Sequence, residues 1–106
     1  MEQRNWYYVY TFAYPDETIF YVGKGINERI KSHLYEAGGR RTSISKVASV
    51  IRSLWQRGEK VIIRKPYKDL TEYEAFQMER SLIALLGYEH LVNQSWHECH
   101  KMKSIS

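Results

Sequence analysis

The N-terminal segment has the period-two pattern of a β-strand. From Asn5 to Ala13, aromatic residues occupy every second position, and aromatic or β-branched residues fill most positions between them. Both types favour a pleated sheet, so this segment is predicted to be a strand. A turn is expected at residues 14–17, a second strand from Thr18 to Gly23, and a break at Lys24-Gly25. The two strands would form a hairpin.

Two segments with helical spacing follow the hairpin. Apolar residues at positions 26, 30 and 34 recur every four residues, which predicts a helix capped by Asn27 and running to about Ala37. Gly38-Gly39 would end it. A second helix is predicted from a cap at Thr42 or Ser43, because apolar residues at 44, 47, 48, 51, 54 and 55 share one face up to Gly58.

The last third of the chain predicts one more strand and one more helix. Val61 to Lys65 is strand-like, and Pro66 either ends this strand or places it at a sheet edge, because proline cannot donate to a ladder. Residues 71–74 (Thr-Glu-Tyr-Glu) form a capping box for a helix to about Leu86, with Gly87 at its end. The order β-β-α-α-β-α predicts a small α/β domain, with an antiparallel or mixed sheet of about three strands flanked by helices.

Glu79 stands out in the last predicted helix because it falls inside the apolar stripe that contains Ala75, Leu82 and Leu86. A lone carboxylate on an apolar face is costly unless it is paired, neutral or bound to a cation. Two accounts remain open at this point. One is a buried salt bridge, for which Arg29 is a candidate partner. The other is a metal ligand, since Mg²⁺ sites often combine one or two carboxylates with substrate phosphate.

The net charge of +4 is unevenly distributed. Between Lys24 and Lys65, eleven Lys and Arg stand against three Glu, so this stretch carries +8, and each flanking segment carries −2. A basic centre favours a polyanionic partner, because phosphate neutralisation supplies most sequence-independent affinity for nucleic acids. A solvated basic face without a ligand would carry the same charge. The candidate nucleic-acid contacts are Lys24, Arg40, Arg41, Lys46, Arg52 and Arg57.

Arg29 and His33 are four residues apart and share a face of the first predicted helix. Arginine suits bidentate phosphate recognition, and histidine can move a proton near neutral pH. Either residue, taken singly, could also be an ordinary surface side chain. The chain has nine tyrosines. A tyrosine hydroxyl titrates near pH 10, so Tyr10 or Tyr21 would need a nearby positive charge or metal to take part in proton transfer.

The ordered set of these residues resembles the GIY-YIG nuclease superfamily. The segments Tyr8-Val9-Tyr10 and Tyr21-Val22-Gly23-Lys24-Gly25 resemble its two signature triplets, with Tyr8 in place of the first glycine. Each triplet alone is a weak signal, but the whole set in order is specific and spans about residues 6–95. The second triplet and residues 70–76 are similar to the branch found in LEM-domain-associated nucleases and in phage and bacterial proteins. The remaining residues that carry the resemblance are Arg29, His33, Glu79 and Asn93.

The resemblance implies a phosphodiester hydrolase that acts on DNA, with RNA a weaker candidate. Glu79 would bind a single divalent metal, Mg²⁺ with Mn²⁺ able to substitute. Tyr10 would be the general base for water or would position the water, and Tyr21 would orient the nucleophile or the scissile phosphate. Arg29 would stabilise the charge of the transition state, and His33 would assist proton transfer or contact phosphate. The supporting residues implied by the resemblance are Lys24, Gly23 and Asn93.

Two other functions are compatible with parts of the sequence. A non-catalytic nucleic-acid-binding module would need only the basic centre. A zinc module would use His97, Cys99, His100 and His90, but the His-x-Cys-His spacing is too tight for a common zinc finger and there is only one cysteine. A solvated polar tail over residues 96–106, following a nuclease domain over residues 1–95, is therefore expected.

The composition suggests an intracellular protein. Cys99 is the only cysteine and cannot form an internal disulfide, which favours a reducing compartment. No apolar run reaches membrane-spanning length, and the N-terminus has no signal-peptide pattern. We therefore expect a cytoplasmic protein, in the host cell if a phage encodes it. No separate DNA-targeting domain is apparent, so a homodimer or a partner protein could supply specificity.

Overall fold

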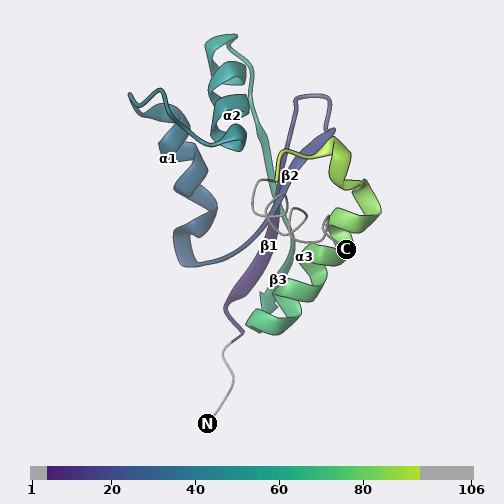
Figure 1. The fold of residues 1–106 in the computed structure, drawn as a ribbon. Helices are drawn as coiled ribbons and strands as arrows, with labels where there is room; N and C mark the ends of the chain where they lie inside the picture. Colours follow the sequence, from purple (N-terminus) through teal and green to yellow (C-terminus); the bar gives the residue numbers. More distant parts are fainter. Residues whose placement is uncertain (1–4, 94–106) are drawn as a thin grey trace, which may run out of the picture.

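A computed structural model describes residues 5–93 and shows one antiparallel sheet with helices on both faces (Figure 1). The strands are β1 (Tyr7–Ala13), β2 (Ile19–Ile26) and β3 (Ile62–Leu70), in the spatial order β2-β1-β3. The helices are α1 (Ser32–Gly38), α2 (Lys46–Gln56) and α3 (Glu72–Leu86), with short 3-10 turns at Asn27–Lys31 and Tyr88–His90. The predicted element order and the three-stranded sheet are therefore confirmed.

The sheet separates two hydrophobic clusters, and each cluster belongs to a different set of helices. Tyr8, Tyr10 and Phe12 point to the face that α1 and α2 cover, together with Ile51 and Leu54 of α2. The alternate residues of the sheet, Val9 and Val22, point to the opposite face, where they meet Ala75 and Ile83 of α3. Residues 8–13 are all buried because both faces of the central strand are covered. Figure 1 shows α3 on the opposite side of the sheet from α1 and α2.

Strand β2 and the segment after it differ from the sequence prediction. The strand does not break at Lys24-Gly25: Lys24 pairs with Val9 and Gly25 with Tyr8, and β2 continues to Ile26. Asn27 is not a helix cap. It has a φ of 57° and begins a 3-10 turn, and α1 starts only at Ser32. The reason is a long-range contact, because the Tyr8 hydroxyl donates to the Asn27 carbonyl at 2.7 Å and accepts from the Ile30 N–H at 3.0 Å.

The start of α2 and the end of β3 also differ from the sequence prediction. The cap of α2 is Ser45, whose hydroxyl accepts from the Ala48 N–H at 3.2 Å, instead of Thr42 or Ser43. Strand β3 does not stop before Pro66 but runs through it to Leu70. It is an edge strand, as one of the two alternatives for Pro66 required, and its pairing with β1 shifts register between Val9 and Thr11, opposite the proline.

Helix α3 matches its prediction closely. The Thr71 hydroxyl accepts from the Glu74 N–H at 3.1 Å, and the Glu74 carboxylate accepts from the Thr71 N–H at 2.9 Å. This is the predicted capping box. Gly87 ends the helix with a φ of 95°, a backbone conformation that favours glycine. Within residues 5–93, no helix combines the length and the apolar character that crossing a membrane requires.

Candidate active site

The predicted site begins with two tyrosines on the α1 face of the sheet. Tyr10 comes from β1 and Tyr21 from β2, and their ring centroids lie 6.0 Å apart. Tyr10 is only 2% exposed, and its ring lies directly over Gly23 of β2. A Cβ at position 23 would lie 2.6 Å from Tyr10 Cζ and 2.7 Å from its hydroxyl oxygen. Gly23 is therefore the residue that allows the Tyr10 hydroxyl to reach the edge of β2.

The two tyrosines act on each other's ionisation. Burial raises the pKa of Tyr10 far above its ordinary value, and the neighbouring Tyr21 raises it further. Burial also raises the pKa of Tyr21, whereas the nearby Tyr10 hydroxyl lowers it. Both tyrosines are therefore protonated near neutral pH.

His33 of α1 lies next to the Tyr21 hydroxyl. Its Nε2 lies 3.2 Å from the Tyr21 hydroxyl, and its Nδ1 lies 3.6 Å from Glu36 Oε1 on the next turn of the same helix. The ring also makes edge contacts with Tyr21 and Phe12. Burial lowers the pKa of His33, although Glu36 acts against this effect. The imidazole is therefore neutral at neutral pH, with one nitrogen available as an acceptor.

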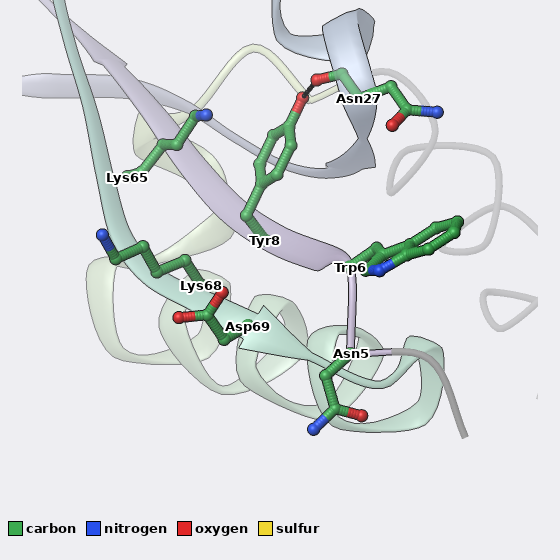
Figure 2. Close-up of a pocket in the computed structure, with 7 residues that line it drawn as sticks. All are labelled: Asn5, Trp6, Tyr8, Asn27, Lys65, Lys68 and Asp69. Atoms are coloured by element: carbon green, nitrogen blue, oxygen red, sulfur yellow. Dashed lines mark hydrogen bonds between the residues drawn. The ribbon is translucent and has the colours of Figure 1, made fainter. Parts of the chain in front are cut away.

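Arg29 lies in the 3-10 turn between β2 and α1 and is exposed. Its positive charge lowers the pKa of both Tyr10 and Tyr21, which shows that it acts on the same site. The turn is held by the two hydrogen bonds of Tyr8, and Figure 2 shows the one to Asn27. A Cβ at Gly25 would lie 2.8 Å from the Arg29 Cβ, so the turn packs tightly against β2. Tyr8, in place of the glycine of the first triplet, thus fixes the turn that presents Arg29.

Glu79 projects from α3, on the opposite side of the sheet, and is half-buried. Burial raises the pKa of Glu79, and the charges of Lys24 and Arg80 lower it. Its own charge raises the pKa of Tyr21, so the carboxylate lies close enough to act on the tyrosines. The structure shows no ion pair between Glu79 and Arg29, and within residues 5–93 the Glu79 carboxylate forms no ion pair at all. The buried salt bridge, one of the two hypotheses for Glu79, is therefore not formed among residues 5–93.

The donor set near Glu79 fits one kind of metal site. No group of three or more His, Cys, Asp and Glu side chains suited to a metal occurs among the described residues. An all-protein cage is thus not built from residues 5–93. A half-buried carboxylate without an ion pair fits a hard divalent cation whose other ligands are water and substrate phosphate. His97, Cys99 and His100 lie outside the described residues, and His90 lies 3.5 Å from Glu89.

Asn93 braces the outer edge of β2. It is 3% exposed, its side-chain oxygen accepts from the Val22 N–H at 3.1 Å, and its amide donates to the Val22 carbonyl. The neighbouring Val92 N–H donates to the Phe20 carbonyl at 2.8 Å. The chain after α3 therefore pairs with the strand segment that carries Tyr21 and Gly23, which fixes both residues in place.

The basic residues predicted to contact nucleic acid are in different environments. Arg40 and Arg41 are exposed in the loop between α1 and α2, and Lys46 opens α2. Lys24 lies between Glu79 and the ring of Tyr7. Arg57 pairs with Glu59 at 3.0 Å on the surface. The structure adds two lysines that the sequence analysis did not select: Lys65 and Lys68 line an open pocket of about 420 Å³ beside the Arg29 turn (Figure 2).

Arg52 has a structural task. Its guanidinium donates to four backbone carbonyls around the end of α1, those of Ala37 at 2.8 Å, Arg41 at 2.7 Å, and Glu36 and Gly39 at 3.1 Å each. These bonds satisfy carbonyls that a helix C-terminus leaves without partners. A guanidinium committed to four carbonyls has little donor capacity left for phosphate, so the structure accounts for Arg52 without nucleic acid.

We expect Arg52→Ala to destabilise the fold by about 2–3 kcal/mol, because hydrogen bonds from a charged donor are lost and carbonyls are left unpaired. Chemical denaturation measures this change. Arg57→Ala is the matched control and should change stability by less than about 1 kcal/mol, since its ion pair with Glu59 is exposed. If Arg52→Ala leaves stability unchanged and weakens DNA binding instead, the structural assignment of Arg52 is wrong.

The sequence analysis missed Tyr8, Glu36 and Ser45 as contributors to the site. Glu36 stands three residues after His33, a spacing that places two side chains on one helix face, so this signal was available. Ser45 binds the Glu36 carboxylate through its N–H and its hydroxyl, both at 2.9 Å. The tertiary contacts of Tyr8 and Ser45 join segments that no local pattern relates.

A three-stranded antiparallel sheet, with two tyrosines, a histidine and an arginine at one edge and a glutamate from the helix behind it, defines a domain of the GIY-YIG type. Comparison with known proteins supports this classification of the domain. A model of the LEM-3-like GIY-YIG domain family matches residues 10–105, and the chain belongs to this family. The superfamily is one of nucleases, which act on DNA and generally use a divalent metal ion.

Two mammalian proteins are similar to this chain. Ankyrin repeat and LEM domain-containing protein 1 of mouse is 35% identical over 81 residues, which cover 72% of this chain and 15% of the mouse protein. The human protein of the same name is 30% identical over 90 residues, covering 77% of this chain and 14% of that protein. The match thus spans about one seventh of these relatives, and it gives no support to a phage or bacterial origin. No solved structure matches the chain.

Proposed function

We propose that this chain is a divalent-metal-dependent endonuclease that hydrolyses phosphodiester bonds in DNA. The observation that supports this most directly is the cluster of Tyr10, Tyr21 and His33, in which the tyrosine rings lie 6.0 Å apart and the Tyr21 hydroxyl lies 3.2 Å from His33 Nε2. The charges of Arg29 and Glu79 act on this cluster. Separate segments of the chain supply these five residues, and membership of a nuclease family supports the same reading.

In this proposal Tyr21 and His33 accept and transfer the proton of the attacking water. Tyr21 is more exposed than Tyr10, and its hydroxyl lies 3.2 Å from His33 Nε2, so it can take the water proton while it passes its own proton to His33. Tyr10 is buried, which suits the positioning of water, one of the two roles that the resemblance implies for it. Arg29 is exposed and its charge acts on both tyrosines, so it can neutralise the charge that develops on the phosphate.

Glu79 would hold the metal ion, with Mg²⁺ the expected cation and Mn²⁺ a substitute. A bound divalent ion supplies charge neutralisation at the scissile phosphate. The charge of Lys24 acts against the rise that burial causes in the pKa of Glu79, and so favours the ionised carboxylate that a metal ligand needs. Asn93 holds the β2 edge between the two halves of the site.

The nucleic acid would lie across the basic surface that surrounds this edge. Arg40 and Arg41 are exposed in the loop between α1 and α2, and Lys46 and Arg57 are at the two ends of α2. Lys65 and Lys68 line the pocket next to the Arg29 turn. Contacts of this kind bind backbone without reading sequence. We propose that a second copy of the chain or a partner protein supplies preference for a DNA structure, and that the protein acts in the cytoplasm.

A cleavage panel tests the proposal. The purified chain is incubated with linear, supercoiled, single-stranded and branched DNA and with RNA, each with Mg²⁺, Mn²⁺ or EDTA. We expect metal-dependent cleavage of at least one DNA form and none in EDTA. Salt-sensitive binding without cleavage of any form would overturn the proposal and favour the non-catalytic binding module instead.

A further inference from the structure

Glu36 follows His33 by three residues on α1, and its carboxylate faces the imidazole ring. Its Oε1 is 3.6 Å from His33 Nδ1, while Nε2 of the same ring is 3.2 Å from the Tyr21 hydroxyl. Because a carboxylate attracts an N–H and repels a ring lone pair, this contact favours the tautomer with its proton on Nδ1. The opposite nitrogen is then unprotonated and can accept from Tyr21.

The Glu36 carboxylate is itself fixed from outside α1. The Ser45 N–H donates to Oε2 and the Ser45 hydroxyl donates to Oε1, both at 2.9 Å. The Ser45 N–H holds the pKa of Glu36 below its ordinary value, so the group stays ionised. The Glu36 carboxylate therefore cannot turn away from His33 without losing both contacts with Ser45.

We propose that Glu36 is a positioning residue, which holds His33 in the Nδ1-protonated tautomer so that Nε2 receives the Tyr21 proton. The inference rests on the proposed nuclease function for its catalytic meaning. As water attacks phosphorus, one water proton passes to the Tyr21 oxygen while the Tyr21 proton moves to Nε2. Tyrosine is left neutral, His33 becomes an imidazolium beside the Glu36 carboxylate, and the leaving oxygen of DNA takes a proton from solvent.

Glu36→Gln tests this with little change of shape. The Ser45 N–H must still find an acceptor, so the amide oxygen of Gln would face Ser45 N and its NH₂ would face His33. The NH₂ donates to Nδ1 and forces the proton onto Nε2, which can no longer accept from Tyr21. We expect cleavage to fall about a hundredfold, the size of a general acid–base contribution, with the fold retained.

The tautomer of His33 is measured directly by nitrogen NMR of the ring. The wild-type chain should show a protonated Nδ1 and an unprotonated Nε2, and Glu36→Gln should show the reverse. Glu28→Gln removes an exposed carboxylate that pairs with Lys31 at 3.0 Å, and it should change neither readout.

The outcomes separate the inference from the proposed function. If wild-type protein cuts DNA and Glu36→Gln cuts equally well, Glu36 has no positioning role and the nuclease proposal stands. If wild-type His33 carries its proton on Nε2, the inference is wrong whatever the activity. If the wild type cuts no DNA, the nuclease proposal fails, and the NMR spectra still decide whether Glu36 sets the tautomer.

Discussion

Glu79→Gln should abolish most DNA cleavage while leaving the fold intact. The substitution keeps the size of the side chain and removes its charge, so the proposed cation loses the carboxylate of its protein ligand. Metal ions contribute several kcal/mol to stabilising a phosphoryl transition state, which corresponds to a loss of about 10²–10³-fold in rate. Initial cleavage rates across a titration of Mg²⁺ or Mn²⁺ measure this loss.

Glu79→Gln should lose cleavage activity without losing stability. Because burial raises the pKa of Glu79 above its unfolded value, the ionised carboxyl costs stability at pH 7. The cost disappears as the pH falls and the carboxyl is protonated in both states. Glu79→Gln should therefore be at least as stable as wild type at pH 7, with the difference shrinking towards acid pH in thermal denaturation.

Glu72→Gln is the matched control for Glu79. It lies in the exposed first turn of α3, outside the capping box bonds, and should leave cleavage and metal dependence unchanged. Two results would count against the assignment: full activity of Glu79→Gln with an unchanged metal requirement, or an equal loss of activity in both variants. The second result would point to a general effect of charge on α3.

The parts of the fold that the sequence predicted well are those set by local chemistry. The capping box of α3 and the glycine at its end need only neighbouring residues, and both are present as predicted. The end of β2 was predicted too early, because Lys24 and Gly25 look like a break when read alone. In the structure they pair with Val9 and Tyr8 of the central strand, and the Tyr8 hydroxyl then sets the turn that replaces the expected helix start.

The residues of the candidate site also differ in how well local sequence chemistry predicts them. Glu79 was found from its place on an apolar helix face, and the structure gives it a half-buried position with a raised pKa. The link from Tyr21 through His33 to Glu36 could not be derived from spacing alone, because it needs β2 and α1 to meet in space. Arg52 makes contacts that its charge alone does not predict. Its charge suggested a phosphate contact, whereas its donors bind the end of α1.

Gly23→Ala should inactivate the site by moving Tyr10. The new methyl group would lie under 3.0 Å from three atoms of the Tyr10 ring and hydroxyl. The ring cannot give way easily, because it is buried between Tyr8, Phe12 and Tyr21, with centroids 5.4–6.0 Å away. Overpacking of this kind costs about 1–3 kcal/mol of stability. We expect the Tyr10 ring to shift relative to Tyr21 and cleavage to fall at least about tenfold, as a shift of about 1 Å in a positioned group can cost a hundredfold.

Gly58→Ala separates this effect from simple destabilisation. Gly58 ends α2 with a φ of 75° and has no atom within 4 Å of its would-be Cβ, so alanine there is strained without touching the site. It should lose about 1 kcal/mol of stability and keep wild-type cleavage.

Tyr10→Phe keeps the ring and removes only the hydroxyl. If it retains activity while Gly23→Ala loses it, the Tyr10 hydroxyl is not needed, and the glycine serves only to seat the ring. If Gly23→Ala itself cleaves like wild type at full folding, the close approach of Tyr10 to β2 has no catalytic importance.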